Sequence, residues 1–127
     1  MEVAEITIKW YGFLITGVKT YKVSFIDEIR EKIKEGKYFM SQHAVVESAK
    51  DMVDDEDIAA AIVGGELIED YPDDKRGHSC LICGMMKDRR CLHIVAGMAK
   101  ENAVIITTYL PSSDKWETTF KRRKNNG

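Results

Sequence analysis

No apolar run in this chain of 127 residues approaches the roughly 18 residues that span a membrane. The first five residues contain two glutamates and no basic residue, so they lack the charge pattern of a secretory signal peptide. Cysteine is scarce, with three residues, and the odd number favours a reducing compartment. A chain of this length buries roughly two thirds of its unfolded surface, so its stability requires no disulfide or metal. We therefore expect one soluble, cytoplasmic domain that does not associate with membranes.

Several catalytic signatures are also missing. The sequence has no glycine-rich phosphate loop, no Ser-His-Asp series and no paired-carboxylate motif. Gly64 and Gly65 end a predicted helix instead of opening one, which argues against a nucleotide loop. There is no internal repeat, and we expect residues 121–127 to form a mobile basic tail.

Charge of one sign is concentrated in one part of the chain. The net charge of the chain is −2. Residues 1–85 hold 10 Lys/Arg and 17 Asp/Glu, whereas residues 86–127 hold 9 Lys/Arg and 4 Asp/Glu. A basic C-terminal part suits contact with phosphates or with an acidic protein segment. A solvated basic face is the simpler alternative.

The hydrophobic periodicity predicts an α+β fold. Alternation of apolar and polar residues predicts a strand or hairpin over residues 3–23, ahead of a single domain at 24–120. Two or three helices then begin at Ser24, Ser41 and Asp54 or Asp55, and Gly36 ends the first. The residues expected to face the core are Ile26, Ile29 and Ile33 of the first helix, Ala44, Val45, Val46 and Ala49 of the second, and Ile58, Ala61 and Ile62 of the third.

The second half of the domain changes to the period of β-strands. Short polar turns separate the four apolar runs Glu66–Tyr71, Ser79–Met85, Cys91–Met98 and Ala103–Leu110. Consecutive short connections favour an antiparallel meander, and the helices have one face of that sheet as their packing partner. The expected fold is therefore helices on a four-stranded antiparallel meander, with an extra N-terminal strand or hairpin.

The three cysteines and one histidine have the composition of a metal site, because zinc prefers four Cys or His ligands. They are arranged as Cys80-x-x-Cys83 and Cys91-x-His93. The residues between the first two cysteines continue a strand, so Cys80 and Cys83 should point to opposite faces of the sheet. We therefore expect the cysteines to pack as small hydrophobes and His93 to be a buried sheet residue, and we predict no metal and no cofactor.

His43 is a candidate catalytic residue. It follows the predicted cap Ser41 in the first turn of a helix, where free backbone N–H groups can hold a phosphate. The helix dipole there favours a neutral imidazole that can act as a base. The alternative is a histidine that packs or bonds locally to support the helix start.

Aromatic and basic residues at the strand ends are candidates for contact with nucleic acid. Tyr71, Tyr109 and Trp116 either stack on bases or cover the edge of the core. The candidate phosphate contacts are Lys75, Arg76, Arg89, Arg90, Lys115, Lys121, Arg122, Arg123 and Lys124.

The order of motifs resembles domain-of-unknown-function family 4258 over about residues 25–120. The resemblance rests on Phe39–Ala44, Asp55-x-x-Ile58, Gly65–Asp74, Ser79–Gly84, Leu92–Val95 and Ile105–Trp116. This family is similar to small RelE/ParE-like toxins of type II toxin–antitoxin systems. The resemblance implies a compact fold of helices on an antiparallel sheet and an endoribonuclease that an antitoxin protein blocks.

In such a ribonuclease, which would need no metal, the 2′-hydroxyl of the RNA attacks the adjacent phosphate. His43 is then the base or the acid, Arg76, Arg89 or the 121–124 cluster stabilises charge, and Tyr71 or Tyr109 orients the substrate or donates a proton. The expected partners are an antitoxin and RNA or the ribosome. Two rival functions are a non-catalytic module that binds an acidic partner segment and a Cys/His metal-binding protein.

Overall fold

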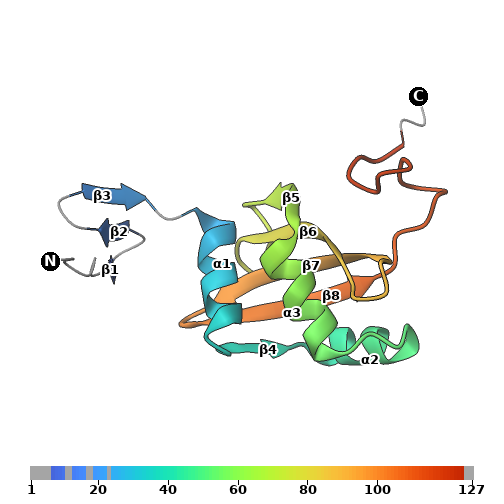
Figure 1. Ribbon diagram of the computed structural model, residues 1–127, viewed down its shortest axis with the longest axis horizontal. Helices are drawn as coiled ribbons and strands as arrows, with labels where there is room; N and C mark the ends of the chain where they lie inside the picture. Colours follow the sequence, from blue (N-terminus) through green and yellow to red (C-terminus); the bar gives the residue numbers. More distant parts are fainter. Residues whose placement is uncertain (1–6, 11–12, 17–18, 23, 125–127) are drawn as a thin grey trace, which may run out of the picture.

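The computed structural model describes residues 7–10, 13–16, 19–22 and 24–124 (Figure 1). Its first three strands, β1 (Thr7–Trp10), β2 (Phe13–Thr16) and β3 (Lys19–Lys22), pair antiparallel in a sheet of their own. The strand or hairpin predicted over 3–23 is thus a three-stranded meander, and the remaining residues of that range lie outside the described part. None of the described helices is both long and apolar enough to cross a membrane.

Three helices follow at the predicted positions. They are α1 (Phe25–Lys34), α2 (Gln42–Lys50) and α3 (Asp55–Gly64). Side-chain oxygens of Ser24, Ser41 and Asp54 each accept a backbone N–H three residues later, which satisfies a donor that the helix leaves unpaired. Gly36 has a φ of +73°, a left-handed conformation, so the predicted end of α1 at this glycine is confirmed.

The main sheet has five strands in the order β4-β8-β7-β6-β5. The strands are β4 (Tyr38–Met40), β5 (Glu66–Tyr71), β6 (Ser79–Met85), β7 (Cys91–Ala99) and β8 (Asn102–Tyr109). The last four form the predicted antiparallel meander, but β4 pairs parallel with β8. The expectation of a purely antiparallel sheet is therefore wrong, and the reason is that β4, with three residues, is too short to show a period of two.

The helices α1 and α3 pack on one face of this sheet (Figure 1). The predicted core residues of both helices are buried, and Ile29, Ile58 and Ile62 are fully enclosed. The backbone of α3 lies so close to β6 that an added Cβ at Gly84 would be 2.1 Å from the Ala61 carbonyl oxygen. This close approach sets the spacing between the helical layer and the sheet.

The predicted burial of α2 is wrong in part. Ala44 is buried, but Val45 and Val46 are about half exposed, and Ala49 is also exposed. The physical reason is that α2 lies beside β4 and β8, at the edge of the sheet, so only its narrow side with Ala44 and Ser48 is covered.

The chain after β8 folds back onto the domain. Trp116 is buried at 3% exposure and forms an isolated β-bridge with Arg123. The Arg123 guanidinium forms an ion pair with Glu69 of β5. Residues 121–124, which the sequence predicts to be part of a mobile tail, thus contact the domain through this bridge and this ion pair. Residues 125–127 lie outside the described part of the chain.

Candidate functional site

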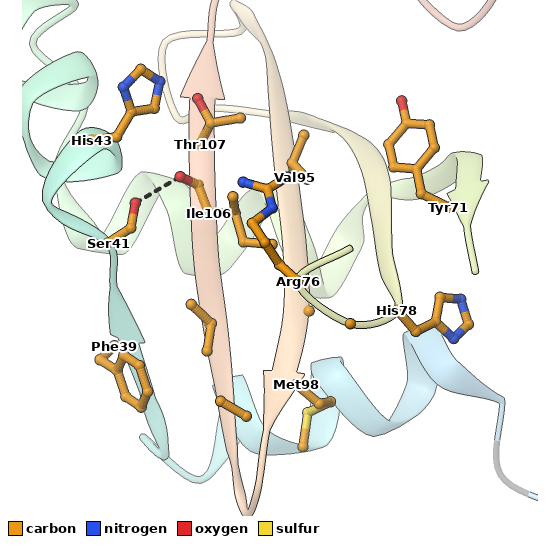
Figure 2. Close-up of a pocket in the computed structure, with 14 residues that line it drawn as sticks. Phe39, Ser41, His43, Tyr71, Arg76, His78, Val95, Met98, Ile106 and Thr107 are labelled. Carbon is orange, nitrogen blue, oxygen red and sulfur yellow. Dashed lines mark hydrogen bonds between the residues drawn. The ribbon is translucent and has the colours of Figure 1, made fainter. Parts of the chain in front are cut away.

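A cleft of about 640 Å³ opens on the sheet face opposite α1 and α3 (Figure 2). Its floor is apolar and comes from the neighbouring strands β7 and β8, with Val95, Gly97, Val104 and Ile106. Polar side chains stand around this floor. They are Ser41, His43, Tyr71, Arg76, His78 and Thr107.

Ser41 fixes the wall that carries His43. Its hydroxyl accepts the Ala44 N–H at 3.0 Å and donates to the Ile106 carbonyl at 2.7 Å. The ladder between β7 and β8 shifts register at this point, so Ile106 is the extra residue of a bulge. The first turn of α2 is thereby tied to the sheet, and His43 stands exposed at the rim of the cleft. No hydrogen bond to the His43 imidazole occurs within the described part of the chain.

Arg76 projects over the cleft from the loop between β5 and β6. Figure 2 shows its side chain reaching over the middle of the sheet, between His43 and Tyr71. The guanidinium bonds Asp74 through two nitrogens, at 3.2 and 3.0 Å, and the Ser79 hydroxyl donates to the same carboxylate at 2.7 Å. These bonds hold the pKa of Asp74 well below its usual range. The arginine is therefore oriented before any ligand arrives.

Tyr71 and His78 form the opposite wall. The Tyr71 hydroxyl donates to Glu69, and burial together with this bond raises the pKa of Tyr71 to about 12. Tyr71 therefore keeps its proton at neutral pH and remains a hydrogen-bond donor. His78 stacks on Phe25 with ring centroids 3.7 Å apart and bonds Asp70, so it is held in place as part of the wall.

The polar lining of the cleft carries no carboxylate. Its ionisable side chains are His43, Tyr71, Arg76 and His78, although the chain as a whole has 21 Asp/Glu against 19 Lys/Arg. A cleft with an apolar floor and only neutral or cationic polar groups suits a ligand that combines a flat apolar part with negative charge.

A second group of side chains lies on the same face, under the C-terminal segment 111–124. His93 is fully buried, its Nε2 is 2.7 Å from the Phe120 carbonyl oxygen, and its Nδ1 is 3.1 Å from the Tyr109 hydroxyl. The Trp116 ring packs edge-on against the His93 ring, with ring centroids 4.4 Å apart. Burial lowers the pKa of His93, so its imidazole is neutral at pH 7.

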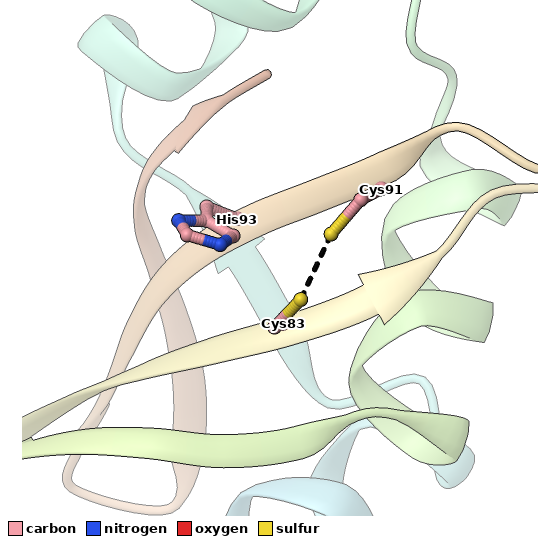
Figure 3. A group of neighbouring side chains, drawn as sticks. All are labelled: Cys83, Cys91 and His93. Atoms are coloured by element: carbon pink, nitrogen blue, oxygen red, sulfur yellow. Dashed lines mark hydrogen bonds between the residues drawn. The ribbon is translucent and has the colours of Figure 1, made fainter. Parts of the chain in front are cut away.

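The cysteines divide between the two faces of the sheet, as predicted. Cys80 belongs to the core under the helices, whereas Cys83 pairs in register with His93 on the other face. Cys91 lies two residues before His93 on the same strand, and its Sγ is 2.8 Å from that of Cys83 (Figure 3). The ligand atoms of Cys83, Cys91 and His93 all lie within 4.8 Å of one another. The sequence-based expectation of packing alone did not anticipate this grouping.

The structure brings three of the four predicted catalytic residues to one cleft and leaves the fourth elsewhere. His43, Tyr71 and Arg76 line the cleft, and Tyr109 contacts His93 instead. His43 follows β4 and Tyr71 ends β5, and these are opposite edges of the sheet. Four strand spacings separate the two edges, or roughly 19 Å.

The predicted RNA-binding residues do not form one surface. Arg89 and Arg90 lie in the hairpin between β6 and β7, at the far end of these strands from Arg76. Trp116 is buried, which fits the second of its two predicted roles, covering the edge of the core, and removes it from the exposed surface. The other predicted RNA-binding residues are all exposed, but Lys121 pairs with Glu66, Arg123 with Glu69 and Arg90 with Asp88.

Sequence reasoning missed three contributors to the site. Ser41 was read only as a helix cap, and its second bond to the bulge at Ile106 depends on strand pairing that the sequence does not display. Thr107 lines the cleft because the same bulge changes the alternation of β8. His78 is absent from the sequence-based candidates, because its stacking on Phe25 is a contact between distant segments.

Comparison with known proteins gives a family for this chain. No curated protein and no solved structure matches it. The model of one family, described as a domain of unknown function (DUF4258), matches residues 40–110, which is more than half of the chain. The matched segment runs from the end of β4 to the end of β8 and includes Ser41, His43, Tyr71, Arg76 and His78. This chain therefore belongs to the DUF4258 family.

Proposed function

We propose that this protein is a toxin-type domain of a type II toxin–antitoxin system and that it binds and cleaves single-stranded RNA in the cleft. The observation that carries the proposal is the lining of this cleft, which joins an apolar floor to His43, Arg76 and Tyr71 without any carboxylate. Single-stranded RNA offers unstacked bases for an apolar surface and phosphates for a cation. The RelE/ParE-like character of the protein rests on resemblance and belongs to this proposal.

In this proposal, different parts of an RNA chain meet different parts of the cleft. A base rests on the floor at Val95 and Ile106, and the adjacent phosphate meets the Arg76 guanidinium. Because roughly 19 Å separates the two edge strands, one phosphate cannot touch both His43 and Tyr71. Tyr71, whose hydroxyl proton is donated to Glu69, therefore contacts a neighbouring nucleotide through its ring and positions the substrate.

The reaction uses the 2′-hydroxyl of the RNA as the nucleophile. His43 takes the proton of this hydroxyl as its oxygen attacks the adjacent phosphorus. Arg76 stabilises the negative charge on the five-coordinate phosphorane. The bond from phosphorus to the 5′-oxygen breaks, and this oxygen takes a proton from water in the open cleft. The products are a 2′,3′-cyclic phosphate and a 5′-hydroxyl.

A non-catalytic interaction module is the second candidate, and one observation favours it. Phe39, Val45 and Val46 are 45–51% exposed beside β4, whose outer edge pairs with no other described strand. An edge strand next to apolar side chains can take an added strand from a partner protein. In the toxin proposal the same edge is where an antitoxin would dock.

Induced expression followed by mapping of new RNA 5′ ends tests the proposal. Expression of the wild-type protein should inhibit growth and create new 5′-hydroxyl ends, and His43→Gln and Arg76→Ala should abolish both effects. Arg90→Ala is a matched control, because Arg90 is also an exposed loop arginine paired with the aspartate two residues before it, but it lies outside the cleft.

The control separates loss of a cleft residue from loss of positive charge. If Arg90→Ala lowers cleavage as much as Arg76→Ala, the cleft is not the RNA site. If His43→Gln leaves both growth inhibition and the new ends intact, His43 is not the base. Absence of any new ends with the wild-type protein would favour the interaction module.

A further inference from the structure

The geometry points to a metal site that is separate from the RNA cleft: we propose that Cys83, Cys91 and His93 bind a Zn²⁺ ion on the sheet face opposite α1 and α3, under the C-terminal segment. Register places the three side chains together, because Cys83 is directly opposite His93 and Cys91 is two residues before His93 on the same strand. Their ligand atoms lie within 4.8 Å of one another (Figure 3). Two sulfurs and one imidazole nitrogen form a ligand set that zinc prefers.

The distance between the two sulfurs requires only a small adjustment. In tetrahedral coordination with zinc–sulfur bonds of about 2.3 Å, two ligating sulfurs lie about 3.8 Å apart. The Sγ atoms of Cys83 and Cys91 are 2.8 Å apart, so each must move outward by about half an ångström. Rotation about the Cα–Cβ bonds supplies this movement without a change in the strands.

The hydrogen bonds of His93 prepare one of its nitrogens to be a ligand. The Phe120 carbonyl oxygen can only accept a hydrogen bond, so Nε2, at 2.7 Å from it, carries the proton. Nδ1 then has a free lone pair, which now accepts from the Tyr109 hydroxyl at 3.1 Å. Metal-ligating histidines usually donate their other N–H to a carbonyl, carboxylate or similar acceptor. With Nδ1 as the ligand, the Phe120 carbonyl has this role and the ion replaces the Tyr109 hydroxyl; with Nε2 as the ligand, the ion replaces the Phe120 carbonyl and Nδ1–H donates to the Tyr109 hydroxyl oxygen.

A second cavity gives the ion access and leaves its fourth position open. This cavity has a volume of about 580 Å³ and is lined by Cys83 and Cys91 together with Glu66, Phe120 and Lys121. Two of these lining residues, Lys121 and Glu66, form an ion pair at 2.8 Å. Three protein ligands and an accessible fourth position are the arrangement that lets a zinc ion hold a water molecule or an external ligand.

Titration of the reduced, metal-free protein with Co²⁺, followed by displacement with Zn²⁺, tests the site. We expect one Co²⁺ per chain, a thiolate-to-cobalt charge-transfer band and the intense visible bands of tetrahedral coordination, all of which Zn²⁺ should remove. Cys91→Ser and His93→Gln should abolish these signals. Cys80→Ala is the matched control, since Cys80 is the third thiol of the chain but lies on the opposite face, and it should leave them unchanged.

Thermal unfolding supplies a second measurement for variants that fold less well. Zn²⁺ should raise the Tm of the wild-type protein and of Cys80→Ala, and it should not raise the Tm of Cys91→Ser, whose altered side chain is only partly buried. Lack of stoichiometric Co²⁺ binding by the fully reduced wild-type protein would overturn the proposal. Equal loss of binding in Cys80→Ala and Cys91→Ser would also overturn it.

Discussion

Replacement of Gly84 by alanine tests the close packing of α3 against the sheet. The added Cβ would lie 2.1 Å from the Ala61 carbonyl oxygen and 2.5 Å from the Ala61 Cα, whereas ordinary contact begins at 3.4 Å. Both obstructing atoms belong to backbone, so the clash cannot be relieved by a rotamer change and α3 must withdraw. This movement loosens Ile58 and Ile62, which are fully buried.

We expect Gly84→Ala to lower the free energy of unfolding by about 3 kcal/mol, at the upper end of the usual cost of overpacking. For a domain of this size the loss corresponds to a fall in Tm of about 12 °C. Thermal unfolding followed by circular dichroism measures it. Gly64→Ala is the matched control, because no atom lies within 4 Å of its added Cβ, and helix propensity predicts an unchanged or slightly higher Tm. An unchanged Tm for Gly84→Ala would refute the described packing.

Three further substitutions test other parts of the structure. Trp116→Ala removes the ring that packs on His93 and lies under the Arg123 guanidinium, and it should speed tryptic cleavage at residues 121–124 while the domain remains folded. Arg123 holds the pKa of Glu69 below its usual value of 4.5. The ion pair therefore stabilises the protein above about pH 4.5, and this contribution is lost as the pH falls through the lowered pKa. Glu69→Gln should lower the free energy of unfolding in urea by about 1 kcal/mol at pH 7 and should have no effect well below pH 4. Thr108→Val should raise the free energy of unfolding by about 1 kcal/mol, because the buried Thr108 hydroxyl has no hydrogen-bond partner within the described part of the chain.

The sequence was sufficient where local chemistry decides the structure. Ser24, Ser41 and Asp54 start the three helices, and the capping residues alone predict these starts. The four long strands appear within one or two residues of their predicted ends, because an apolar run between polar turns has few other ways to satisfy its backbone.

The sequence was insufficient where distant segments meet. Nothing local to residues 38–40 shows that they pair with β8, and this pairing moves α2 to the sheet edge and leaves Val45 and Val46 exposed. The prediction for Cys80 and Cys83 succeeded because alternation along one strand decides it. The meeting of Cys83 with Cys91 and His93 depends on the register between two strands, which the residue pattern alone does not fix.

The most direct test of the central claim is to map where RNA binds. A short single-stranded RNA with 2′-O-methyl groups cannot be cleaved by 2′-hydroxyl attack, so its complex can be studied by NMR at equilibrium. The proposed function predicts chemical-shift changes at cleft residues such as His43, Gly77, Gly97 and Thr107, which Arg76→Ala weakens and Arg90→Ala does not. Shift changes confined to Val45, Val46 and the rest of the exposed α2 surface, or no changes at all, would contradict it.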